Sequence, residues 1–259
     1  MKKIVNTLLF ASIITTSMFS HGTQDAKQIM ASVKHRDQGL DRYSDVDLVQ
    51  TMSDGFVRSR SLKMYEKEFG EERKGLLYFT EPSNTAGTGL LMYSYAEIEK
   101  KDDDQWLYLP ALRKVKRIAT NSKEGPFLGT DFSFADIERM RLSDYIYTVK
   151  DSKDAMSIIE ATTENGLENP RTGYSKRIVH VDTEKNIILK DEIYRQGRLI
   201  KVFEVVKLEK VDGFWTVVEA KMDNLVDGGN TRLIRKNTQY NQKLKEDLFN
   251  QRTLRKGLD

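Results

Sequence analysis

The chain has 259 residues, a net charge of +3 and no cysteine. The absence of cysteine excludes disulfides, thiolate metal sites, a thiol nucleophile and lipid attachment at a cysteine. Lys2 and Lys3 account for two of the net positive charges, so the rest of the chain carries +1. A chain this close to neutral does not have the broad positive field that binds phosphate backbones, and nucleic acid is not an expected partner.

The first residues have the pattern of an export signal. Two lysines precede an apolar run over residues 4–19, and polar residues at 15–17 make that run a poor membrane span. Ser20-His21-Gly22 then provides a small-x-small cleavage site. We expect a signal peptide over residues 1–22 and a single domain over residues 23–259; an uncleaved membrane anchor is the alternative.

The next segment predicts an amphipathic helix. Ala26, Ile29, Met30 and Val33 follow one another at i, i+3, i+4 and i+7, the spacing of one helix face. Asp25 is placed to cap its N-terminus.

After Gly39 the period changes to two, which is typical of strands. Val46 and Leu48 share one face of the first strand, and Asp45 and Asp47 share the other. Further strands are expected at 62–64, 76–79, 106–109, 145–149, 156–159, 178–181, 187–194, 199–208, 214–222 and 231–235. The short turns between the later strands are Asp182-Thr183-Glu184-Lys185, Gln196-Gly197, Asp212-Gly213 and Asp227-Gly228-Gly229-Asn230.

Such short connections join antiparallel neighbours, because parallel strands need a long crossover. The pattern therefore predicts a mainly β fold, an antiparallel meander of about ten strands with few helices. One face of several strands is apolar, as in Phe214, Val218, Ala220 and Met222. An apolar face has to be covered, so we expect the sheet to curl on itself around a helix.

Residues 127–142 interrupt the strand pattern. The run Phe127-Leu128-Gly129-Thr130-Asp131-Phe132-Ser133-Phe134 combines three phenylalanines with glycine and cap-forming residues. Ser133 with Asp136 resembles a helix N-terminus, and Ile137 and Met140 continue from Phe134 at helical spacing. We expect a loop and a short helix that act either as a plug of the core or as a lid over a cavity.

No residue pattern points to catalysis, a metal or a cofactor. None of the histidines, His21, His35 and His180, has a Glu or His at a metal-ligand spacing. No G-x-S-x-G elbow, P-loop or G-x-G-x-x-G occurs. Asp102-Asp103-Asp104 precedes a strand and is interpreted as a solvated turn.

A basic run at Arg113, Lys114, Lys116 and Arg117 follows the strand at 106–109. It is interpreted either as a contact for anionic lipid headgroups or an acidic partner, or as the exposed face of an edge strand, where lysines discourage aggregation.

Two central blocks resemble a known family. Gln105 to Ile118 (QWLYLPALRKVKRI) and Phe127 to Ile137 (FLGTDFSFADI) are similar to the signature of LolA-like outer-membrane lipoprotein-sorting proteins. The stretch from Glu81-Pro82 to Gly89, and Asp247-Leu248-Phe249 with Leu254, also fit.

The resemblance implies an incomplete, strongly curved antiparallel barrel of the LolA/LolB type, with helices across its open side. It also implies a periplasmic carrier that needs no cofactor and binds an acyl chain of a lipid or lipoprotein. The expected partner is an inner-membrane permease of the resistance–nodulation–division (RND) type. This chain is longer than the founding carrier, and the lid arginine of that carrier has no matching position here. The residues expected to form the cavity or lid are Phe127, Leu128, Phe132, Phe134, Ile137, Trp106 and Tyr108.

Two other functions remain open. The chain could be a structural protein of the envelope whose interior is filled by its own side chains. An envelope hydrolase is the third hypothesis, although no reactive group of residues supports it. We expect a monomer with peripheral membrane contact.

Overall fold

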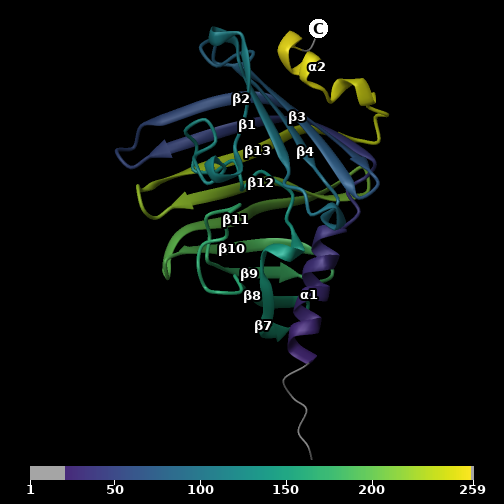
Figure 1. Cartoon of the computed structure of the whole chain (residues 1–259), viewed down its shortest axis with the longest axis vertical. Coiled ribbons are helices and arrows are strands. Elements are labelled where there is room, and N and C mark those ends of the chain that lie inside the picture. Colours follow the sequence, from purple (N-terminus) through teal and green to yellow (C-terminus); the bar gives the residue numbers. More distant parts are fainter. Residues whose placement is uncertain (1–20, 258–259) are drawn as a thin grey trace, which may run out of the picture.

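The computed structural model describes residues 21–257 and shows one antiparallel sheet of 13 strands (Figure 1). The spatial order is β6-β5-β4-β3-β2-β1-β13-β12-β11-β10-β9-β8-β7, so two meanders are joined where β1 pairs with β13. The expected mainly β, incomplete and strongly curved barrel is confirmed, with more strands than the ten expected. Residues 1–20 of the expected signal peptide lie outside the described part of the chain.

The strands are β1 (Asp41–Met52), β2 (Val57–Phe69), β3 (Glu72–Glu81), β4 (Gly89–Ser94), β5 (Asp104–Leu109), β6 (Lys114–Arg117), β7 (Ile146–Lys153), β8 (Met156–Thr162), β9 (Lys176–Asp182), β10 (Ile187–Arg195), β11 (Arg198–Val211), β12 (Phe214–Asn224) and β13 (Gly229–Tyr240). The α-helices are α1 (His21–Lys34) and α2 (Gln251–Lys256). Short 3₁₀ helices are Glu97–Glu99, Pro110–Leu112, Thr120–Ser122, Leu142–Asp144 and Glu246–Leu248.

Tight turns set the register of the second meander. Gln196-Gly197 joins β10 to β11 with φ of 49° and 72°, and Asp212-Gly213 joins β11 to β12 with φ of 50° and 90°. Two consecutive positive φ values define the turn whose twist matches that of paired strands, and glycine adopts them without strain. These dipeptides therefore specify hairpins, as their sequence predicted.

The list of expected strands left out β4 and β6, although one interpretation of the basic run was the exposed face of an edge strand, and β6 confirms it. β4 is an unbroken apolar run because it is buried on both faces: Leu90 packs with Phe127, whereas Leu91 packs with Leu254. A strand buried on both faces has no period of two to detect. β6 is only four residues long and lies at the edge of the sheet, with Lys114, Lys116 and Arg117 exposed.

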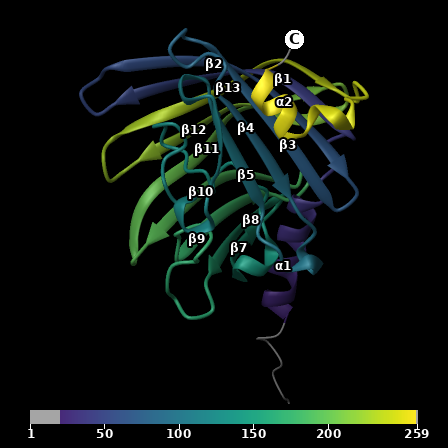
Figure 2. The ribbon, with the colours of Figure 1, turned by 45° about the horizontal axis from the view of Figure 1, so that its top comes forward.

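Each face of the sheet has its own cover. The face that we call the inner face is crossed by residues 118–141, here named the covering segment, and its end at β7–β9 is closed by α1 (Figure 1). In α1, Ala26 and Met30 are buried against Val179 and Val181, as the helical spacing predicted, but the helix begins at His21 and contains Asp25 instead of being capped by it. α2 lies on the outer face, over β4–β6 (Figure 2).

Within residues 21–257, no helix combines the length and the hydropathy needed to span a bilayer.

Candidate functional site

The covering segment packs aromatic side chains onto the inner face of β1–β5. Phe127 is 3% exposed, and its ring centroid lies 6.0 Å from that of Phe79 on β3 and 5.5 Å from that of Phe134. The other buried residues of this cluster are Val46, Leu48, Leu62, Leu77, Leu90, Met92, Leu107 and Ile118. The apolar side of the sheet is thus covered by the chain's own aromatic residues.

The expected short helix after Phe132 does not form. Ser133 and Asp136 do bond reciprocally: Ser133 N–H donates to Asp136 Oδ2 at 2.7 Å, and Asp136 N–H donates to Ser133 Oγ at 3.1 Å. This capping box is followed only by turns, in which Glu138 N–H bonds Ala135 O, three residues back. Phe134 O, which would accept from Glu138 N–H in an α-helix, accepts from Gln105 Nε2 instead.

Side-chain hydrogen bonds attach the covering segment to strands on both sides of the β1–β13 junction. Gln50 Nε2 donates to Gly129 O at 2.8 Å, and Thr231 Oγ1 donates to Asp131 Oδ2 at 2.6 Å. Gln105 Nε2 on β5 donates to Phe134 O at 2.8 Å. The segment has no strand or α-helix of its own, so these bonds and its aromatic side chains hold it in place.

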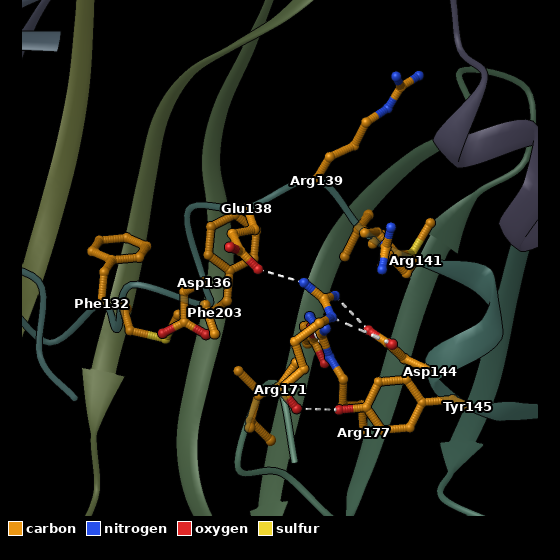
Figure 3. Close-up of a pocket in the computed structure, with 17 residues that line it drawn as sticks. Phe132, Asp136, Glu138, Arg139, Arg141, Asp144, Tyr145, Arg171, Arg177 and Phe203 are labelled. Atoms are coloured by element: carbon orange, nitrogen blue, oxygen red, sulfur yellow. Dashed lines mark hydrogen bonds and ion pairs between the residues drawn. The ribbon is translucent and has the colours of Figure 1, made fainter. Parts of the chain in front are cut away.

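Toward β7–β11 the same segment enters a buried ionic network. Lys123 Nζ lies 2.5 Å from Glu138 Oε1, and both side chains are almost fully buried. Arg171 bonds the other oxygen of Glu138 and lies 2.5 Å from Asp144 Oδ2, as the dashed lines in Figure 3 show. Burial raises the pKa of Glu138, and Asp103 adds to this effect, against the opposing influence of Lys123 and Arg171.

Asp103 corrects the interpretation of residues 102–104 as a solvated turn. Asp103 and Asp104 are 3% and 7% exposed. Asp103 accepts a hydrogen bond from Tyr95 N at 3.1 Å and lies 3.5 Å from Arg141, and its burial raises its pKa. The cations of the network, not solvent, surround this carboxylate.

A second polar contact ties the covering segment to β11. Tyr174 OH donates to Asp136 Oδ1 at 2.8 Å, and Lys201 Nζ lies 3.1 Å from Asp136 Oδ2. Burial, and then the charge of Asp136, hold the pKa of Tyr174 well above its ordinary value.

A cavity of about 210 Å³ lies between the covering segment and the inner face of β9–β12 (Figure 3). Its apolar lining consists of Phe132, Met140, Ile188, Ile193, Phe203 and Met222. Its polar lining includes Arg141, Arg171, Arg177 and Asp191. The volume is below the roughly 300–1,000 Å³ of ordinary ligand pockets, so a long hydrocarbon chain needs space that the covering segment now fills.

The structure brings together five of the expected cavity residues. Four of them pack with the apolar cluster on β1–β5: Phe127, Leu128, Phe134 and Ile137. Phe132 lines the cavity, and Ile137 also contacts the second apolar cluster, which contains Phe132.

Trp106 and Tyr108 do not join them. Both pack on the outer face of β5, with the cluster that contains Leu254 of α2. Their neighbour Leu107 occupies the inner face, as strand alternation requires. The basic run lies on the edge strand β6 and the turn before it, and Arg117 Nε bonds Asp104 Oδ1 at 2.6 Å.

Arg177 and Asp191 were missed from sequence. Arg177 has the same strand parity as Val179 and Val181, and Asp191 has that of Ile193, so each is a charge on an otherwise apolar face. Arg177 Nε bonds Asp191 Oδ2 at 2.9 Å across β9 and β10. A charged residue in phase with buried apolar residues was the available signal.

Among the described residues, no group of three or more His, Cys, Asp or Glu side chains could hold a metal ion.

The curved open sheet with a covered inner face defines a LolA-like fold. The chain belongs to the protein family whose model is described as "-like: Uncharacterized protein" and matches residues 71–256. No curated protein matches the sequence.

Solved structures agree with this fold. A DUF1329 family protein from Desulfovibrio piger is 28% identical, with a TM-score of 0.83 over 90% of this chain and 99% of the other. A candidate outer membrane lipoprotein-sorting protein domain from Vibrio parahaemolyticus is also 28% identical, with a TM-score of 0.81 and the same coverage. A LolA superfamily protein from Nitrosomonas europaea is 18% identical, with a TM-score of 0.63 over 88% of this chain and 97% of the other, and it supports the fold alone.

Proposed function

We propose that this chain is a periplasmic carrier that binds an acyl chain of a lipid or lipoprotein on the inner face of its sheet and passes it across the cell envelope. The LolA-like fold supports a carrier-type role in general terms. The observation that carries the proposal is the covering segment, which shields the apolar inner face with aromatic side chains but has no strand or α-helix of its own.

An acyl chain would take the place of Phe127 and Phe134. Transfer of hydrocarbon from water gains about 0.8 kcal/mol per CH₂ group, so a chain of ordinary length offsets the loss of two aromatic contacts. Binding then selects a state in which the covering segment has moved aside, and release restores the closed state. The cycle needs no covalent chemistry.

Export by a signal peptide over residues 1–22 and action as a monomer belong to the same proposal. An inner-membrane permease of the RND type would supply or accept the cargo. The most direct place for contact with a membrane or permease is one end of the sheet. Strand order places the β1–β2, β5–β6, β8–β9 and β12–β13 connections there together, and we call it the hairpin end.

The hairpin end carries apolar side chains that are exposed to solvent. They are Phe56 (57% exposed), Val57 (52%), Leu112 (62%), Leu167 (62%), Leu225 (52%) and Val226 (64%). The expected headgroup contacts Arg113 and Lys114 begin beside Leu112. Dispersed apolar side chains with neighbouring cations suit the interfacial region of a bilayer. The tip of the covering segment at Gly129 is bonded to β1 near the same end.

A structural protein with a filled interior is the second candidate, and the small cavity favours it. Native mass spectrometry of the exported protein, purified without detergent, separates the two. A carrier co-purifies with lipid and exchanges it for an added fluorescent acyl probe. A protein of apo mass that does not bind the probe is the result expected of a structural protein.

A further inference from the structure

Two residues that line the cavity each have one buried polar atom without a hydrogen-bond partner among the described residues. The atoms are Asp191 Oδ1 and Arg141 Nε. Asp191 is 2% exposed, and only its other oxygen is bonded, to Arg177. A buried donor or acceptor that is left unpaired destabilises the protein, so an occupant that offers both a donor and an acceptor would stabilise the cavity.

The charges around the cavity are already matched. Arg177 pairs with Asp191, and Arg171 with Glu138 and Asp144. The remaining lining charges are also paired, as Asp136 with Lys201, Arg139 with Glu68, and Arg141 with Asp103. An anionic or cationic head group would arrive without a free counter-charge, and burying an unpaired charge is costly.

The apolar wall adds the second requirement. Phe132, Phe203 and Met222 line the cavity, and Figure 3 shows Phe132 and Phe203 on the side away from Asp144. A ligand that meets both walls has hydrocarbon attached to a compact polar group.

We propose that this cavity is a head-group site for uncharged, hydroxyl-bearing amphiphiles. Asp191 Oδ1 accepts the hydroxyl proton, and Arg141 Nε donates to an oxygen of the head group. This inference rests on the proposed carrier function and specifies its cargo: the acyl chain lies under the covering segment on β1–β5, and the head group lies between β9–β10 and the covering segment.

The test compares three amphiphiles with the same saturated chain, each below its critical micelle concentration: a monoacylglycerol, the fatty-acid anion and the alkyltrimethylammonium cation. Each displaces a fluorescent acyl probe from the full-length mature protein. We expect the monoacylglycerol to bind at least about tenfold more tightly than either ion, a difference of about 1.4 kcal/mol. Equal affinities, or tighter binding of an ion, would overturn the head-group site.

The substitution Asp191→Asn should reverse the preference between the monoacylglycerol and the fatty-acid anion. The amide oxygen accepts from Arg177, and the amide nitrogen then presents a donor to the cavity where the wild type presents an acceptor. The substitution also removes the negative charge that pairs with Arg177. We expect the preference to move from the monoacylglycerol to the fatty-acid anion, with the far-ultraviolet circular dichroism of the wild type.

Glu192→Gln is the matched control. Glu192 follows Asp191 on β10, its side chain lies on the opposite face, and Lys190 Nζ bonds it at 2.8 Å. This variant should keep the wild-type preference, and the same reversal in it would contradict a role for Asp191. If Asp191→Asn does not fold, the wild-type affinities decide alone. If the protein binds neither the probe nor any of the amphiphiles, the carrier function itself is contradicted. If it binds them without selectivity, only the head-group site is contradicted.

Discussion

The inner face of the sheet has two regions that differ in how the covering segment is held. On β1–β5 the contacts are apolar, with Phe127 and Phe134 packed on aliphatic side chains. Toward β7–β11 the contacts are ionic. Asp136 pairs with Lys201 on β11, and Glu138 is buried against Lys123 of the segment itself and Arg171 of the β8–β9 connection. One continuous segment, residues 118–141, thus lies on two surfaces of opposite chemistry.

The difference suggests a division of labour. Apolar packing is non-directional and can be exchanged for another hydrocarbon at little net cost. Buried ion pairs depend on geometry, and removing one partner leaves an uncompensated charge. The apolar region is therefore suited to exchange with an acyl chain, and the ionic region is suited to anchor the segment and to distinguish head groups.

The largest effect on lipid retention is expected when charge is placed on the aromatic part of the covering segment. Replacing both Phe132 and Phe134 by Asp should abolish lipid retention, because hydrocarbon would then have to bury two carboxylates. The strand signal in circular dichroism should persist. Leu40→Asp, at an exposed position away from the hairpin end, is the control and should retain lipid. Unchanged retention in the double variant would remove Phe132 and Phe134 from the site.

The ionic region can be broken by Glu138→Ala. Lys123 and Arg171 would remain buried without their shared partner, and we expect the free energy of unfolding to fall by about 3–5 kcal/mol. Urea unfolding followed by circular dichroism measures the change. Glu164→Ala, in an exposed turn, should cost less than about 0.5 kcal/mol. A similar small cost for Glu138→Ala would show that the network does not anchor the covering segment.

Low pH should weaken the attachment of α1 to the rest of the protein. Glu97 accepts hydrogen bonds from Leu142 N at 2.8 Å and Ser143 N at 3.1 Å and pairs with Lys34 of α1. Burial alone would raise the pKa of Glu97, but these partners outweigh it and hold the pKa at about 2. Because the folded pKa lies below the ordinary value, the stabilisation is present above about pH 4.5 and is lost as the pH falls toward 2.

Melting temperatures measured between pH 7 and pH 2 test this point. The wild type should lose more stability over the acid range than Glu97→Gln, which has no carboxylate to protonate at this position. Parallel curves for the two proteins would show that Glu97 does not link α1 to the 3₁₀ helix Leu142–Asp144.

The smallest effect is expected at the hairpin end. Phe56→Ser with Val226→Ser should weaken binding to vesicles containing anionic lipid several-fold, and should change stability by less than about 0.5 kcal/mol, because both side chains are exposed. Leu40→Ser, exposed near the other end of the sheet, is the control. Equal vesicle binding by all three proteins would exclude this end as the membrane contact.

The apolar region was more accessible to sequence reasoning than the ionic one. Alternation placed Val46 and Leu48 on one face, helical spacing identified α1, and the clustered phenylalanines marked the covering segment. These are properties of neighbours in sequence. β4 was lost because its two faces are buried by elements far apart in the chain, the covering segment and α2.

The ionic region depends on long-range pairing. Lys123 and Glu138 are brought together by the path of a loop, and Arg171 comes from the separate β8–β9 connection. From sequence alone, Asp103 is interpreted as part of an exposed acidic turn, because its partners Arg141 and Arg171 are distant in the chain. Local pattern has no information on such contacts, although Arg177 in phase with Val179 was a detectable exception.

The central claim is that hydrocarbon reaches the inner face only when the covering segment moves. The chain has no cysteine, so Asp131→Cys with Thr231→Cys would introduce a single pair of thiols where Thr231 Oγ1 now lies 2.6 Å from Asp131 Oδ2. The measurement is binding of a fluorescent acyl probe to this variant, first oxidised and then reduced. We predict that the disulfide abolishes probe binding and that reduction restores it. Full binding by the oxidised protein, with the cross-link verified by mass, would contradict the account.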